Sequence, residues 1–202
     1  MVNRFHDTAH RQMRDGILDA AAAEAVARGW KGLQMQSVAA ASGVSRQTLY
    51  NTFTNKHGLA QALVLRLTEQ FLDGVEQALN SHVEIYDQWV AAIRYTLDAA
   101  AADPLLKAVL TADGSDELLP LLTSEAGPVI RAARNRLSAV LRATRPDLNH
   151  DDITVATEAA ARLAISHIVL PLHPTEQAAE QIAQLVDRFL APDTRDSSPK
   201  AS

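Results

Sequence analysis

The amino-acid sequence predicts an all-α protein, and two of its features support that prediction. Ala, Leu, Glu, Gln and Arg dominate the chain, and these residues favour helices. Apolar residues recur at helical spacing, and no segment shows a sustained alternation with a period of two. With 202 residues, of which 47% are hydrophobic, the chain can bury a sizeable core. We expect about nine helices, divided between a small N-terminal domain of about three and a larger helical domain.

The N-terminal domain is expected to begin with a loose arm at residues 1–10. A first helix then covers residues 11–28 and ends near Gly29, because glycine is common just beyond a helix C-terminus. Two shorter helices follow at about 35–42 and 46–52.

A larger helical domain follows these short helices. Asn55 is expected to cap a long helix over about 56–80, whose leucines repeat along one face. Pro104 opens a short helix, because proline suits the first turn. The other predicted helices lie at about 83–102, 125–144, 151–170 and 175–190, and a short Leu-rich segment at 116–123 precedes the second of these. The end of the chain is polar and rich in Pro and Ser, so we expect it to be disordered. The predicted divisions are therefore 1–55, 56–191 and 192–202.

Residues 34–53, QMQSVAAASGVSRQTLYNTF, predict two helices joined by a tight turn. Gly43 lies where the chain must reverse, and glycine tolerates the positive φ that such a turn needs. Ser45 stands at an N-cap position, where its hydroxyl can accept from backbone N–H groups of the next turn. In the second helix, Leu49 and Phe53 are four positions apart and are expected to share a buried face.

The outward positions of this second helix carry groups that suit DNA. Arginine can pair with guanine, Gln and Asn can pair with adenine, and hydroxyl groups can reach phosphates. We therefore interpret residues 44–53 as a recognition segment for the major groove. The predicted contacts are Arg46, Gln47 and Asn51 to bases, Thr48, Tyr50 and Lys56 to phosphates, with Gln36, Val44 and Ser45 also in the interface and Arg4, Arg11 and Arg14 of the arm beside the groove.

A wider set of residues extends this pattern: Ile17-Leu18, Ala20-Ala21, Gly29, Val38-Ala39, Ala41, Gly43-Val44-Ser45, Thr48-Leu49-Tyr50, Phe53, Lys56 and Leu59. Through these residues the stretch from Arg14 to Leu63 resembles the N-terminal domain of the tetracycline-repressor (TetR) family of transcriptional regulators. The rest of the chain is similar to that family only in its length and helical pattern.

The chain departs from the family pattern at two places. Glu24 and Ala25 replace a usual Leu-Phe pair, which thins the local core and leaves space for Trp30 to refill. Leu33-Gln34 replaces a usual pair of threonines, and glutamine is a poorer N-cap than threonine.

Charge is unevenly distributed along the chain. The net charge is −5, but residues 1–60 hold seven Lys/Arg against four Asp/Glu. A basic N-terminal domain on an acidic body is compatible with nucleic-acid binding. The sequence has no cysteine, no apolar signal segment and no run of apolar residues long enough for a membrane span. We therefore expect a cytoplasmic protein without a membrane segment.

Isolated polar groups among aliphatic side chains in the larger domain indicate a ligand pocket. Such a mixture suits an elongated, mainly apolar pocket for acyl, alkyl or similar hydrophobic molecules. The candidate lining residues are Trp89, Arg94, Tyr95, Asp98, Thr111, Glu125 and His167. For His167, a hydrogen-bonded core histidine is the main explanation, and a donor in the ligand pocket or in the dimer interface is the alternative.

The last two predicted helices, 151–170 and 175–190, each carry a distinctive face. One has a strip of small residues, Ala156, Ala159, Ala160 and Ala164, and the other has a large apolar face, Ile182, Leu185, Val186 and Phe189. Packing within the chain is one explanation of both faces. The resemblance implies another, in which two copies of the chain pair through these helices as a four-helix bundle in a homodimer.

The sequence contains no catalytic motif. It has no G-x-S-x-G, no phosphate-binding glycine loop, no H-E-x-x-H and no acidic or histidine cluster with metal-ligand spacing. We therefore expect a protein that is not an enzyme and that uses no cofactor or metal ion.

These observations favour a sequence-specific DNA-binding regulator. The resemblance implies a repressor that a small hydrophobic ligand releases from a palindromic operator. In a symmetric dimer the two half-sites lie about 34–36 Å apart. Two alternatives stay open: an activator or autoregulator of the same fold, and a helical module whose N-terminal domain binds a protein partner.

Overall fold

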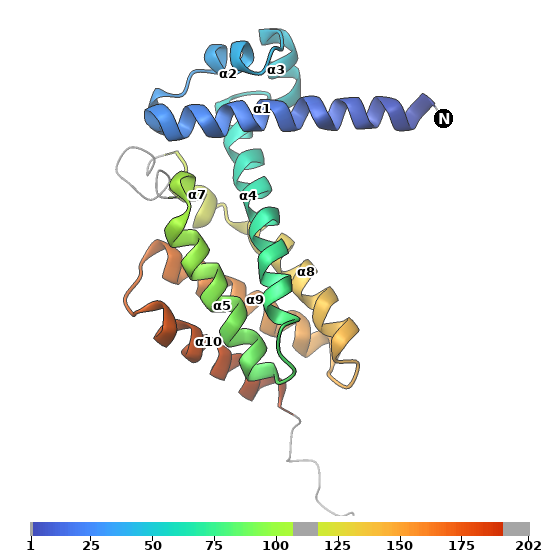
Figure 1. Ribbon diagram of the computed structural model, residues 1–202, viewed down its shortest axis with the longest axis vertical. Helices are drawn as coiled ribbons and strands as arrows, with labels where there is room; N and C mark the ends of the chain where they lie inside the picture. The colour runs from blue at the N-terminus through green and yellow to red at the C-terminus, as the bar shows by residue number, and fades with distance from the viewer. Residues whose placement is uncertain (1, 107–116, 192–202) are drawn as a thin grey trace, which may run out of the picture. The chain divides into compact units, whose positions relative to one another are not determined.

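The computed structural model describes residues 2–106 and 117–191, with side chains from residue 8 onward in the first range. These residues form nine α-helices and no strand, which confirms the predicted fold class (Figure 1). The helices are α1 Val2–Gly32, α2 Met35–Ala41, α3 Arg46–Phe53, α4 Lys56–Leu79, α5 Ile85–Ala102, α7 Leu119–Leu122, α8 Gly127–Thr144, α9 His150–Val169 and α10 Thr175–Leu190.

From α2 to α5 and from α8 to α10 the observed helix bounds lie within two residues of the predicted ones, and α7 lies inside the Leu-rich segment 116–123. Residues 104–106 are helical, as predicted, but the continuation of that short helix lies outside the described residues. The predicted disordered tail, 192–202, also lies outside them. Among the described helices, none is both long enough and apolar enough to cross a membrane.

The prediction of a loose N-terminal arm is wrong. Residues 2–10 are helical and belong to α1, which continues to Gly32 (Figure 1). Residues 2–10 contain no proline or glycine, and adding residues to an existing helix is much easier than starting one. The helix does break at Gly29, where its end was predicted: this glycine has φ 71° and ψ 161°, outside the helical range, so α1 consists of two helical stretches that meet at a kink.

The chain divides into two compact units. The first unit comprises the described parts of residues 1–70 and 99–129. The second unit comprises the described parts of residues 71–98 and 130–202. The core of the first unit includes Ile17, Leu49 and Leu59, all with no exposed surface. Trp30 is also buried there, with 1% of its surface exposed, as expected from the departure at Glu24 and Ala25.

The core of the second unit contains residues from α4, α5, α8, α9 and α10. Trp89 of α5 belongs to this core and has no exposed surface. α4 and α5 approach closely at Gly74, where an added Cβ atom would lie within 2.0 Å of the Tyr95 ring. A side chain at position 74 would overlap the tyrosine ring where it now lies, so it would require this partly exposed ring to move.

The small-residue strip of α9 faces the core of the second unit. Ala156, Ala160 and Ala164 are each at most 5% exposed and belong to this core, so the expectation that they form the dimer interface is wrong. On α10, Ile182 and Val186 are likewise buried in the same core. Helical periodicity identified residues that share a face. These faces of α9 and α10 are buried in the core of the second unit, where the two helices contact each other.

A different apolar surface remains on these two helices. Val155, Leu185 and Phe189 are 55%, 59% and 49% exposed, and Ala159 is also exposed. Large apolar side chains in this arrangement are available to a partner rather than to the core.

Polar contacts also join α8 to α9. Ser138 and Thr157 are buried and share a hydrogen bond of 2.8 Å between their hydroxyl oxygens. At the surface, Glu158 accepts hydrogen bonds from Arg162 at 2.8 Å and from Arg134 at 3.2 Å. These bonds, first that from Arg162 and then that from Arg134, hold the pKa of the Glu158 carboxyl below its ordinary value.

We predict that Glu158→Gln lowers the thermal midpoint of unfolding slightly at pH 7. A carboxyl whose pKa is lowered by folding stabilises the fold above its unfolded-state pKa, and this stabilisation disappears as pH falls through the folded-state pKa. The difference between variant and wild type should therefore shrink as the pH is lowered. Thermal unfolding followed by circular dichroism across this pH range measures it. An equal difference at every pH would show that charge at Glu158 is unimportant.

Candidate nucleic-acid interface

The turn between α2 and α3 has the predicted geometry. Gly43 has φ 70°, the left-handed conformation that favours glycine. The N–H of Val44 then donates to the carbonyl of Ala39 at 3.1 Å, which closes the turn. Ser45 is the N-cap of α3: its Oγ accepts from the backbone N–H of Thr48 at 3.0 Å. The direction in which α3 leaves the turn is therefore set by local hydrogen bonds.

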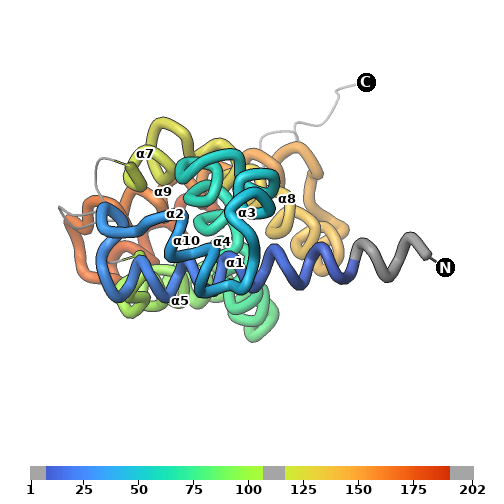
Figure 2. Tube along the Cα trace, turned by 90° about the horizontal axis from the view of Figure 1, so that it is seen from above, coloured from blue at the N-terminus to red at the C-terminus, as the bar shows by residue number. Residues whose placement is uncertain are grey.

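The inner face of α3 anchors it in the first unit. Leu49 and Phe53 are 0% and 4% exposed, as the four-residue spacing predicted. The guanidinium of Arg14, on α1, lies 5.4 Å from the centre of the Phe53 ring. α2 in turn contacts both α1 and α3, and Figure 2 shows these three helices together. The position of Arg14 above Phe53 gives this arginine a packing role at the base of α3.

The outer face of α3 carries the predicted base-reading groups. Arg46, Gln47 and Asn51 are exposed, and Tyr50 is 40% exposed. Gln47 Nε2 donates to Asn51 Oδ1 at 2.9 Å, so the two amides one turn apart are held together. Their remaining carbonyl and NH₂ groups form an acceptor–donor pair, which is the pattern that the adenine N6 and N7 edge complements.

The other predicted interface residues differ in their availability. Thr48 is half-buried and its hydroxyl lies 2.8 Å from that of Ser45, so both hydroxyls serve the cap. Val44 is half-buried in the turn, and Gln36 is exposed on α2. Gln34 is the N-cap of α2 but makes no side-chain cap hydrogen bond, as expected where threonine is replaced.

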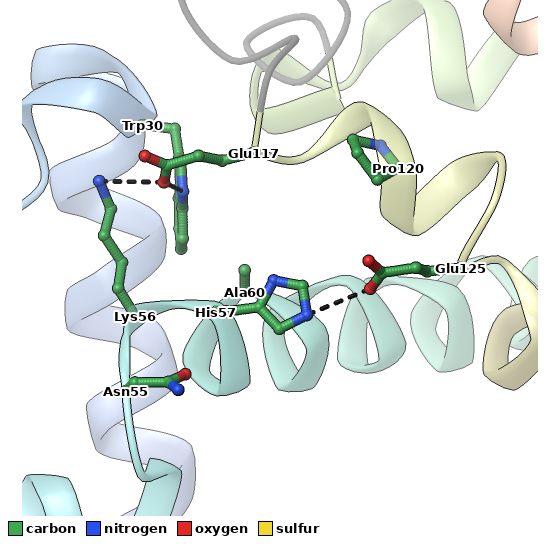
Figure 3. Close-up of a pocket in the computed structure, with 8 residues that line it drawn as sticks. All are labelled: Trp30, Asn55, Lys56, His57, Ala60, Glu117, Pro120 and Glu125. Carbon is green, nitrogen blue, oxygen red and sulfur yellow. Dashed lines mark hydrogen bonds and ion pairs between the residues drawn. The ribbon is translucent and has the colours of Figure 1, made fainter.

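Lys56, a predicted phosphate contact, lies in a cluster of charged and aromatic side chains at the start of α4 (Figure 3). Its Nζ is 3.2 Å from Glu117 Oε2 and 5.4 Å from the centre of the Trp30 ring. Trp30 Nε1 donates to the same Glu117 oxygen at 2.7 Å. The adjacent His57 places its Nε2 3.1 Å from an oxygen of Glu125.

This cluster borders a cavity of about 400 Å³ in the first unit. The lining residues are Trp30, Asn55, Lys56, His57, Ala60, Glu117, Pro120 and Glu125. Sequence reasoning missed Glu117, because its partner Trp30 is 87 positions away and a single acidic residue has no periodic signature. Lys56 could be identified from the sequence because it lies among residues typical of the family, but nothing near Glu117 pointed to their contact.

The predicted ligand-binding residues are not gathered at one described pocket. Glu125 lines the cavity of the first unit, whereas the five residues discussed next belong to the second unit. Thr111 lies outside the described residues.

On α5, three of these candidates are at the surface. Arg94 pairs with Glu176 of α10 at 3.0 Å, Asp98 is exposed, and Tyr95 is 39% exposed against Gly74. These side chains therefore face away from the core of the second unit.

The two other candidates are less exposed. Trp89 is fully buried, and its Nε1 has no hydrogen-bond partner among the described residues. His167 of α9 is half-buried, with its ring centre 6.4 Å from that of His173. Trp89 is thus the candidate that lies inside the second unit.

Comparison with known proteins places this arrangement in a family. A model of bacterial regulatory proteins of the tetR family matches residues 17–63, and a model of the C-terminal domain of the bacterial tetracyclin repressor matches residues 84–188. The chain belongs to the TetR family of bacterial transcriptional regulators, and it is therefore a DNA-binding regulator rather than a general helical interaction module.

Two relatives are similar to the chain over most of its length. The HTH-type transcriptional regulator AlkX of Mycobacterium tuberculosis is 32% identical over 186 residues, which cover 92% of this chain and 88% of that protein. The crystal structure of the TetR family repressor AlkX from Dietzia sp. strain DQ12-45-1b, implicated in biodegradation of n-alkanes, has 33% identity. Its TM-score is 0.77, over 88% of this chain and 94% of that one.

A more distant structure shares the fold. The transcriptional repressor QsdR of R. erythropolis has 18% identity and a TM-score of 0.67, over 89% of this chain and 95% of that one.

Proposed function

We propose that this regulator is a homodimeric repressor that reads a palindromic operator through α3 and leaves it when a small hydrophobic molecule binds. The observation that carries the proposal is the outer face of α3, where Arg46, Gln47 and Asn51 stand exposed on a helix anchored by Leu49 and Phe53. Exposed arginine and amide groups on one short helix are the chemistry of direct readout in the major groove.

Within this face, the three polar side chains are proposed to contact different bases. Arg46 is at the first position of α3, nearest the cap, and its fork of N–H groups fits guanine O6 and N7. The joined amides of Gln47 and Asn51 present one acceptor and one donor toward adenine. Lys56, just beyond α3, supplies a positive charge for the DNA backbone.

Dimerisation is proposed through the exposed apolar surface of α9 and α10, formed by Val155, Ala159, Leu185 and Phe189. α9 and α10 already contact each other through their buried faces. Pairing of their outer faces across a two-fold axis would make a four-helix bundle and would give the operator its symmetry.

The effector is proposed to be a molecule with an alkyl chain. The relative from Dietzia is implicated in biodegradation of n-alkanes, and it matches most of this chain. Trp89, inside the aliphatic core of the second unit, is the candidate residue that such a chain would contact first. The unpartnered Nε1 of Trp89 would orient a polar end group such as a hydroxyl or carboxyl.

The base-reading proposal predicts different effects for two substitutions. Arg46→Ala should weaken binding to the preferred duplex by about 1–3 kcal/mol and relax the preference at one base pair. Lys56→Ala should weaken binding to all sequences about equally and lower the salt slope by roughly one. Duplexes selected by the wild-type protein from a random pool provide the probe, and affinity is measured by fluorescence anisotropy. Unchanged base preference in the Arg46 variant would remove this residue from base reading.

The dimer proposal predicts that Leu185→Arg produces a folded monomer. The side chain is 59% exposed, so the arginine leaves the core intact but places an unpaired charge in the proposed interface. Sedimentation at micromolar concentration should show a monomer with wild-type helical content and much weaker operator binding. Ala160→Arg, which alters a fully buried position, is the contrasting variant and should lose structure. A wild-type monomer, or a dimeric Leu185 variant, would contradict the proposal.

The effector proposal predicts that a long-chain alcohol or fatty acid changes the fluorescence of Trp89 and lowers operator affinity. The chain has two tryptophans, so Trp30→Phe leaves Trp89 as the single tryptophan fluorophore. A coupling of about 1–3 kcal/mol corresponds to roughly 5–150-fold lower affinity. Glucose serves as the polar control. Lower operator affinity without any change in Trp89 emission would place the effector elsewhere, and no response to any alkyl compound would oppose release by hydrophobic ligands.

A further inference from the structure

The ammonium group of Lys56 already has an anionic partner in the protein. Its Nζ lies 3.2 Å from Glu117 Oε2 and above the Trp30 ring, and Trp30 Nε1 holds the same oxygen at 2.7 Å (Figure 3). Trp30 is 1% exposed, so the core of the first unit fixes the group that positions the carboxylate. Glu117 therefore meets Lys56 as an oriented acceptor rather than as a mobile surface charge.

This contact joins segments that are far apart in the sequence. Lys56 and Trp30 lie in the part of the chain that matches the N-terminal family model, residues 17–63, and Glu117 lies in the part that matches the C-terminal one, residues 84–188. All three belong to the same compact unit. Whether the Lys56 ammonium is paired with a carboxylate therefore depends on the position of the segment around Glu117.

A DNA phosphate and Glu117 cannot both be ideal partners of this ammonium. Lys56 is the first residue of α4 and two residues separate it from α3, so a phosphate that reaches it approaches the Glu117 carboxylate as well. Two anions on one ammonium repel each other, and this repulsion offsets part of the attraction to the lysine. The ammonium has further donors for a phosphate, but the phosphate gains its full attraction only when the carboxylate moves away.

We propose that Glu117 competes with the operator backbone for Lys56 and so sets the strength of DNA binding. In the free protein, Glu117 holds the ammonium over Trp30. On the operator, a phosphate takes its place, and the free energy of the lost ion pair is subtracted from that of the new contact. A shift of the segment that carries Glu117 toward or away from Lys56 then tunes operator affinity without any change in α3. This inference rests on the proposed phosphate contact of Lys56.

The size of the effect follows from the exposure of the pair. The side chains of Lys56 and Glu117 are 27% and 49% exposed, and such partly solvated ion pairs contribute little individually. Removal of the competitor should therefore tighten operator binding only about two- to fivefold at low ionic strength. Because salt screens an exposed pair, the gain should shrink as salt is added.

The experiment compares wild type, Glu117→Gln, Lys56→Ala and the double variant on the selected operator duplex over a range of salt concentrations. Glutamine retains an oxygen that accepts from Trp30 Nε1, so the local structure is kept while the charge is removed. Asp19→Asn is the matched control, because it removes one carboxylate of an arginine ion pair, Asp19 to Arg66 at 2.8 Å, in the same unit. Thermal unfolding of each variant shows that it is folded.

Glu117→Gln should bind the duplex two- to fivefold more tightly than wild type at low salt, more tightly than the control variant, and with a gain that falls as salt rises. In the Lys56→Ala background, Glu117→Gln should raise the operator affinity no more than Asp19→Asn does. Equal or weaker binding by Glu117→Gln, or an undiminished gain without Lys56, would overturn the competition. Failure of wild type to bind any duplex would overturn the proposed function as well, whereas wild-type binding with an inert Glu117 overturns the competition alone.

Discussion

The anchoring of α3 by Leu49 and Phe53 is the constraint on which the DNA-reading part depends. α3 has eight residues, and a helix of this length is not stable alone in water. Its two buried side chains and the Ser45 cap hold it against α1 and α2. Only because this inner face is fixed can the outer face present Arg46 and the joined amides in a constant orientation.

Glu117 adds a polar contact to the apolar packing of the first unit. Apolar packing is nondirectional, whereas the contacts of Glu117 with Trp30 and Lys56 depend on the position of one oxygen atom. A small movement of this carboxylate changes the electrostatic environment at the start of α4 while the core beneath it remains packed. The first unit would thus combine a fixed α3 surface, proposed to read DNA, with a neighbouring charge that a small movement can alter.

The parts of the structure that the sequence predicted are those set by local chemistry. The turn at Gly43, the cap at Ser45 and the buried pair on α3 each depend on residues within a few positions of one another. The prediction failed for the Ala156–Ala164 strip because periodicity shows which residues share a face, not whether that face meets the same chain or another one. The Trp30–Glu117 contact required the fold itself, since its partners are 87 positions apart.

The close approach of Gly74 to Tyr95 also has an evolutionary consequence. The glycine leaves room for the tyrosine ring, and a methyl group in its place would occupy the same volume. A side chain at position 74 therefore requires either that the Tyr95 ring turn outward or that position 95 hold a smaller residue. Among descendants of a common ancestor, these two positions are therefore expected to vary together.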